Sequence, residues 1–202
     1  MTDPISGGIR IGAVFKHLAL VAFLTSTARA DDPTLVHGEC DPLPFSTGRY
    51  GCQIGIRPDA FHGVRVAIAQ FSIVAPDAIA QLGGNDGFHL DVRPGSGALY
   101  VLYYLKRPGQ DGFSVGASMR FLRQRYTQDD EPGRHADVTE FSPEAIVGYQ
   151  WHPFHGRFYL QPWAAFGVVL SRRGEPVVGT HRYDELPVSP FFTVNIGWEQ
   201  AL

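Results

Sequence analysis

Residues 112–127 of the 202-residue chain read GFSVGASMRFLRQRYT, and between positions 113 and 121 apolar and polar or small side chains alternate at every step. The apolar positions are Phe113, Val115, Ala117, Met119 and Phe121, and the positions between them are Ser114, Gly116, Ser118 and Arg120. A period of two residues is typical of a β-strand with one apolar and one polar face. Because about 9–11 residues of a tilted strand cross the hydrocarbon layer of a bilayer, this segment is long enough to span a membrane.

The same alternation recurs along most of the chain. With 112–127, the predicted strands are 49–57, 64–74, 88–105, 138–152, 157–172 and 187–199. Short turns at 58–63, 106–111 and 153–156 alternate with long segments at 75–87, 128–137 and 173–185, and one short helix is expected near 76–82. We predict an all-β fold, a single antiparallel up-and-down transmembrane barrel of about eight strands. Seven strands are found, so the eighth lies near 33–47 or 87–105 is split wrongly.

The apolar face is expected to point outward, towards lipid. Arginines and acidic residues share the opposite face, where small side chains and paired charges suit a narrow lumen. The predicted polar lumen cluster is Arg49, Arg57, Arg65, His89, Asp91, Arg93, Arg120, Glu140, Glu144 and Glu199. Aromatic residues of apolar parity lie beside the short turns, as in an interfacial girdle. The predicted girdle is Tyr104, Phe113, Trp151, Phe158 and Trp198, and core packing is the alternative explanation for these aromatics.

The composition is compatible with a membrane location. Charged residues make up 18% of the chain, below the roughly 25% of a typical soluble domain. Lys16 and Lys106 are the only lysines against fifteen arginines, although a GC-rich genome that uses Arg in place of Lys would explain this equally well. Removal of residues 1–30 would take the formal charge from −3 to −5, which argues against a nucleic-acid partner.

The N-terminal segment has the features of a secretory signal peptide. Arg10 and Lys16 precede the short apolar run 18–24, and residues 25–30 end in an A-x-A pattern. We expect residues 1–30 to be cleaved and the proline-containing residues 31–47 to form a tail or plug before a barrel that occupies 48–202. Cys40 and Cys52, the only cysteines, are expected to form a disulfide, since two thiols without CxxC spacing are a poor metal site.

With these features the chain resembles the small bacterial outer-membrane β-barrel proteins of the OmpA-, OmpX- and OmpW-like class. The resemblance covers roughly residues 48–202 and depends on the signal peptide, the hairpin rhythm and the alternating final strand. It implies a Gram-negative outer-membrane location. Two features depart from the class: such barrels usually end on an aromatic residue, whereas this chain ends at Leu202, and they have an even number of strands.

The sequence indicates an architecture and a location rather than a specific activity. We expect a non-catalytic, porin-like outer-membrane protein with a polar, largely plugged lumen, which acts through structure, surface interaction or slow passage of small molecules. Its expected partner is outer-membrane lipid, and no cofactor or metal is expected. The acidic run 129–131 lacks the EF-hand pattern and is interpreted as a solvated charge run rather than a calcium site.

Two other functions remain open. A lipid-modifying hydrolase would need a nucleophile and a base near the membrane rim, and Ser142 and Glu144 with His89 or His135 could supply them. A soluble periplasmic lipocalin-like carrier would show the same alternation with its apolar side inward. The chain contains no Walker, HExxH or CxxC motif, so an enzyme is the less favoured class.

Overall fold

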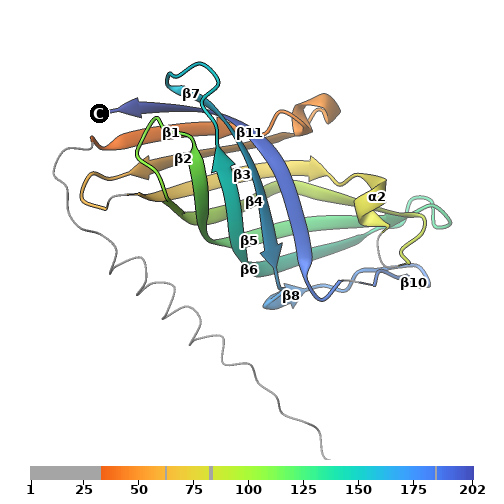
Figure 1. Ribbon diagram of the computed structural model, residues 1–202. Coiled ribbons are helices and arrows are strands. Elements are labelled where there is room, and N and C mark those ends of the chain that lie inside the picture. The colour runs from red at the N-terminus through yellow and green to blue at the C-terminus, as the bar shows by residue number, and fades with distance from the viewer. Residues whose placement is uncertain (1–32, 62, 82–83, 185) are drawn as a thin grey trace, which may run out of the picture.

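The computed structural model describes residues 33–202, except for residues 62, 82–83 and 185, so the predicted signal peptide lies outside the described residues. In this part of the chain eight strands form the barrel: β1 (Leu35–Cys40), β2 (Tyr50–Arg57), β3 (Val64–Val74), β4 (Phe88–Tyr104), β5 (Gly112–Gln128), β6 (Ala136–Gln150), β7 (Phe158–Gly167) and β11 (Ser189–Ala201). Each strand pairs antiparallel with the next along the chain, and β11 pairs with β1, so the sheet closes on itself (Figure 1). The predicted all-β, up-and-down barrel is confirmed.

The eighth strand is β1, within the segment that was expected to form a tail or plug. Its residues Leu35–Cys40 pair with β11 on one side and with β2 on the other. The tail-or-plug interpretation of 31–47 is therefore wrong for these residues, the alternative that the eighth strand lies near 33–47 is confirmed, and the barrel begins before residue 48. With this strand the count is even. The start of the first strand and the end of the last strand then lie at the same end of the barrel, as closure of an up-and-down antiparallel sheet requires. The long 88–105 segment is a single strand, with a bulge between Val92 and Gly97.

The rim of the barrel is uneven. The strands β4 and β5 have 17 residues and β6 has 15, whereas β1 has 6 and β2 has 8. The short turns all lie at the end of the barrel that carries both termini of the sheet, and the long loops lie at the other end (Figure 1). The wall is therefore high along β4–β6 and low at β1 and β2.

The long loops carry the remaining elements. They are a 3-10 helix η1 (Pro44–Thr47), a short helix α2 (Asp77–Ala80), and the strands β8 (Ser171–Arg173), β9 (Val177–Val178) and β10 (His181–Arg182). The β8 strand extends the sheet along β6. Val178 packs with Phe88, Tyr126 and Val138 inside the high side of the wall, so the last long loop covers that part of the lumen mouth with a small apolar core. Asn85 and Asp184 join two of these loops by mutual hydrogen bonds of 2.7 and 2.6 Å.

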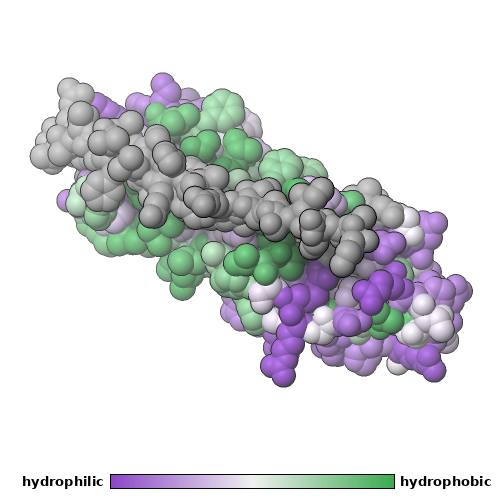
Figure 2. All heavy atoms as spheres, turned by 90° about the horizontal axis from the view of Figure 1, so that it is seen from below, coloured by the Kyte–Doolittle hydropathy of each residue, from purple (hydrophilic) through white to green (hydrophobic). Residues whose placement is uncertain are grey.

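The two faces of the wall follow the predicted orientation on β5. Phe113 and Phe121 are 57% and 42% exposed, whereas Ser114 and Arg120 on the same strand are buried. The outward apolar residues form a band around the barrel: Ile54, Ile56, Val66, Ile68, Leu99, Val101, Val115, Val147, Phe166, Phe192, Val194 and Ile196. Figure 2 shows hydrophobic residues gathered along the wall and hydrophilic residues at the end that carries α2 and β10. Beyond Phe121 the outward positions of β5 become Arg123, Arg125 and Thr127, so this end rises above the apolar band.

The prediction was wrong for the parity of β4. Tyr100, Leu102 and Tyr104 were assigned to the lipid-facing side, but they are 6% exposed or less and form the apolar part of the lumen core. Leu99 and Val101 face outward instead. The reason is that residues 98–105 are apolar or aromatic on both faces, so alternation could not distinguish the two.

No helix among the described residues is long and apolar enough to cross a membrane.

The predicted Cys40–Cys52 disulfide is present between neighbouring strands. It joins the last residue of β1 to β2 and closes the loop that contains η1, at the low side of the rim.

Serine at both Cys40 and Cys52 is expected to lower the free energy of unfolding by about 3 kcal/mol, because the disulfide restricts a loop of this size in the unfolded chain. Urea unfolding in detergent micelles measures the change. Reduction of the native protein should reproduce it, and reductant should leave the double variant unaffected. Equal stability of oxidised and reduced native protein would contradict the expectation.

Candidate functional site

An ion pair between Glu39 of β1 and Arg65 of β3 lies at the centre of the lumen. The Glu39 side chain is fully buried and that of Arg65 is 1% exposed. The Glu39 carboxylate also accepts hydrogen bonds from the Gln53 amide, the Tyr159 hydroxyl at 2.6 Å and the Asn195 amide at 3.0 Å. These five residues are called the lumen plug below, and they come from five strands of the barrel.

Aromatic rings complete the lumen plug. The Arg65 guanidinium lies 5.4 Å from the centre of the Tyr104 ring, and the Tyr104 hydroxyl donates to the Gln161 side chain at 3.3 Å. Gly197 lies opposite Tyr159 on the neighbouring strand, and a Cβ there would overlap the tyrosine ring, so the glycine makes room for it. Buried charge is tolerated only when it is paired and hydrogen-bonded, and Glu39 meets both conditions.

A second polar layer lies between the lumen plug and the short turns. His37 and His152, both buried, approach the Glu199 carboxylate at 3.7 and 3.4 Å, and the Gln150 amide donates to it at 3.3 Å. The His152 backbone N–H donates to Asp111 at 2.6 Å, which connects this layer to a turn. Polar side chains therefore lie inside the barrel at this end as well.

Towards the long loops, two more ion pairs join neighbouring walls. Arg120 and Glu144 lie 3.0 Å apart, and the Ser118 hydroxyl donates to Glu144 at 2.6 Å. Glu140 accepts from Arg172 at 2.9 Å. Within the described residues Glu39, Glu140 and Glu144 therefore each have an arginine partner.

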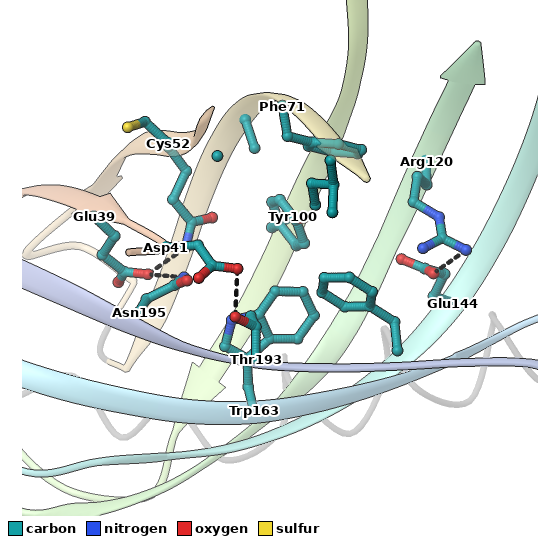
Figure 3. Close-up of a pocket in the computed structure, with 15 residues that line it drawn as sticks. Glu39, Asp41, Cys52, Phe71, Tyr100, Arg120, Glu144, Trp163, Thr193 and Asn195 are labelled. Atoms are coloured by element: carbon teal, nitrogen blue, oxygen red, sulfur yellow. Dashed lines mark hydrogen bonds and ion pairs between the residues drawn. The ribbon is translucent and has the colours of Figure 1, made fainter. Parts of the chain in front are cut away.

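A cavity of about 50 Å³ separates the lumen plug from the Arg120–Glu144 pair. Figure 3 shows Phe71, Tyr100 and Trp163 between two polar ends, with Glu39 and Asp41 at one end and Arg120 with Glu144 at the other. The cavity is large enough for one or a few water molecules or for a very small ligand group.

The predicted lumen cluster is placed inside the barrel only in part. Arg57, Arg65, Arg120, Glu140, Glu144 and Glu199 are buried in the lumen. Arg49 lies at the rim, where it forms a 2.7 Å ion pair with Asp91. His89 and Asp91 do not lie in the lumen, because the reversed parity of β4 places them on the outward face above the apolar band, opposite Thr127 and Arg125 of β5. Arg93, in the bulge that follows, forms a 3.3 Å ion pair with Asp91 and is not in the lumen either.

The predicted girdle also needs one correction. Phe113, Trp151 and Trp198 are about half exposed, and Phe158 is partly buried against Phe154, all beside the short turns. Tyr104 does not belong with them, since it is 4% exposed inside the lumen.

Sequence reasoning missed the acidic centre of the lumen plug. Glu39 and His37 lie in the segment assigned to a tail, where residues 35–40 (LVHGEC) have no apolar face to reveal a strand. The odd count of predicted strands indicated an eighth strand near 33–47 or a wrong split of 87–105, but it did not indicate which residues of the segment face the lumen.

The residues considered for a hydrolase are not brought together. Ser142 is buried in the lumen, where it is 2% exposed. His89 lies outside, between Asp77 and Asp129, and His135 pairs with Asp137 at 3.6 Å. A nucleophile and a base must lie within hydrogen-bond reach of each other, or close to it, to act as a pair.

His89 joins two long loops above the membrane. Its ring nitrogens lie 2.9 Å from Asp77 in α2 and 3.0 Å from Asp129. Hydrogen bonds to the Asp129 and Asp77 carboxylates raise the pKa of His89 above its usual value. A raised pKa in the folded state means that the bridge stabilises the fold fully below the unfolded pKa near 6.5 and loses this effect as the pH rises through the folded pKa.

An NMR titration should therefore find the pKa of His89 above about 6.5, and asparagine at both Asp77 and Asp129 should return it towards that value. The effect on global stability is expected to be small, because the side chain is largely exposed. The amide resonances of the short turn 153–156, at the other end of the barrel, are the control and should be the same in both proteins. A His89 pKa that the substitutions leave unchanged would contradict the bridge.

No protein-family model matches the chain, and no curated protein sequence matches it. Among solved structures, the chain is similar to Neisserial surface protein A, with 13% identity, a TM-score of 0.47 and coverage of 84% of this chain and 97% of the other. It is also similar to the N-terminal β-barrel domain of Pseudomonas aeruginosa OprF, with 12% identity, a TM-score of 0.47 and coverage of 85% and 100%. A major outer membrane protein from Thermus thermophilus matches with 12% identity, a TM-score of 0.43 and coverage of 83% and 98%.

The geometry of the barrel shows which of its surfaces faces lipid. A closed barrel satisfies its backbone hydrogen bonds internally, which is the condition for a β-structure to span a membrane. The apolar band faces outward and the charges are enclosed, which is the arrangement of outer-membrane barrels and the reverse of a soluble carrier. The protein is a membrane-spanning β-barrel of the outer-membrane type.

Proposed function

We propose that the protein is a non-catalytic outer-membrane barrel whose lumen is closed by the lumen plug, and that it acts through its structure and its exposed surface rather than as an open pore. Its principal partner is the surrounding outer-membrane lipid. The observation that carries the proposal is the fully buried Glu39–Arg65 pair, which is bonded to side chains from several strands.

Three further features support a closed lumen. The histidine and Glu199 layer fills the turn end, and the apolar core around Val178 covers the high side of the mouth. The space around Arg65, Gln161 and Trp163 amounts to only about 10 Å³, no more than the smallest space that holds a single water molecule. A path for ions would have to break the Glu39–Arg65 pair.

Planar-bilayer recording tests the proposal. The native protein is expected to give no stable conductance steps. Alanine at both Glu39 and Arg65 removes the pair and should allow ion passage, whereas glutamine at the exposed Glu175 should leave the membrane silent. Stable, large conductance of the native protein would overturn the closed-lumen proposal.

A further inference from the structure

Asp41 differs from the other buried carboxylates of the lumen. Three of the buried glutamates have an arginine partner, Glu39 with Arg65, Glu144 with Arg120 and Glu140 with Arg172, and Glu199 lies beside two histidines. Asp41 is 7% exposed, and no described residue forms an ion pair with it. Its carboxylate oxygens accept hydrogen bonds from the Leu43 backbone N–H at 2.9 Å and from the Thr193 hydroxyl. These neutral donors hold the carboxylate in place and leave its negative charge uncompensated.

The wall beside Asp41 is aromatic. Phe71, Tyr100, Trp163 and Phe191 line the same cavity. Aromatic faces attract cations, and aromatic pockets with an acidic group are a common solution for binding ammonium ions. The opposite end of this cavity already shows the effect, since the Arg120 guanidinium lies 6.0 Å from the centre of the Phe191 ring. At the Asp41 end there is no such cation among the described residues.

The size and position of the cavity limit the ligand. Its volume of about 50 Å³ admits a primary ammonium with one or two carbon atoms, so a longer amine would enter with one end only. Asp41 directly follows β1, at the low side of the rim, and the Val178 core that covers the mouth lies on the opposite, high side along β4–β6. An aliphatic stem can therefore extend from the cavity towards the long-loop side.

We propose that this cavity is a binding site for the primary ammonium group of a small aliphatic amine, with Asp41 as the counter-ion and Trp163 and Tyr100 as the aromatic wall. Such an amine is charged at neutral pH, because its pKa is close to that of lysine. The site lies on the loop side of the lumen plug and does not require passage through it. The proposal therefore goes beyond the closed-barrel function and is independent of it.

Tryptophan fluorescence tests the site. Phenylalanine at both Trp151 and Trp198 leaves Trp163, in the cavity wall, as the only tryptophan. In non-ionic detergent, 1,4-diaminobutane should change its emission saturably, and 1,4-butanediol, the neutral analogue with the same chain and heavy-atom count, should not. Asp41→Asn should weaken the amine response about tenfold or more. Asp59→Asn, at an exposed turn at the other end of the barrel, should leave it unchanged.

Three results would overturn the proposal: no saturable response to the amine, an equal response to the diol, or unchanged amine affinity in Asp41→Asn. Heat-modifiable migration on a denaturing gel checks that each variant is folded. If Asp41→Asn does not fold, Trp163→Leu in the native background decides instead. The amine should raise the unfolding midpoint of the native protein and not that of this variant, and an equal rise in both would equally reject the site.

Discussion

Glu39→Ala is expected to lower the free energy of unfolding by about 3–5 kcal/mol, because it leaves the Arg65 guanidinium buried without a counter-charge. The loss is large since the same carboxylate also accepts hydrogen bonds from Gln53, Tyr159 and Asn195, whose donors lose their partner. Urea unfolding of the barrel in detergent micelles or lipid vesicles measures the change, with heat-modifiable migration on a denaturing gel as the readout of the folded fraction.

The double variant Glu39→Gln with Arg65→Met is the informative comparison. Removal of both charges together should cost less than Glu39→Ala alone, because no unpaired charge is left in the lumen. Glu175→Gln breaks the exposed Arg182–Glu175 ion pair and should change stability by about 0–1 kcal/mol. A Glu39→Ala loss as small as that of Glu175→Gln would show that the pair does not organise the lumen.

Ala117→Arg is expected to destabilise the barrel in a bilayer by about 2–4 kcal/mol, the cost of a lipid-facing arginine near the middle of the membrane. Ala117 lies midway along the outward apolar row of β5, between the exposed Phe113 and Phe121. The chain offers a matched control, since Thr127 is on the same strand and the same outward face, beyond the last apolar position.

Thr127→Arg should cost close to nothing, because its side chain lies outside the hydrocarbon layer. The two substitutions add the same side chain to the same strand, so the difference between them reports depth in the membrane alone. Unfolding from vesicles of defined lipid measures both. Equal effects of the two arginines would contradict the assignment of the apolar band to lipid.

The sequence predicted the wall of the barrel well where the two faces differ in polarity. On β5 each inward residue is polar or small and each outward residue is apolar between positions 113 and 121, so alternation gave the strand and its two faces, and the charged residues on one face gave the orientation. Alternation was insufficient on β4, because Tyr100, Leu102 and Tyr104 face the lumen and the residues between them, which face outward, are equally apolar. One parity error displaced Tyr104 from the girdle and His89, Asp91 and Arg93 from the lumen.

The lumen plug could be predicted only in part, since its partners are brought together by closure of the sheet. Arg65 has a clear polar parity, but its partner Glu39 is 26 positions earlier, in a six-residue strand that has no apolar face. Tyr159 and Asn195 reach the same carboxylate from more than a hundred residues away. Register between strands distant in sequence decides such contacts, and local periodicity carries no information about it.

The inside-out polarity of the wall is tested most directly by brominated-lipid quenching of single tryptophans in vesicles. With phenylalanine at Trp151 and Trp163, the remaining Trp198 faces outward and should be strongly quenched by bromine on the acyl chains. With phenylalanine at Trp151 and Trp198, the remaining Trp163 packs against Tyr100 and Phe191 in the lumen and should keep its emission. Quenching of Trp163 as strong as that of Trp198 would contradict the enclosed polar lumen.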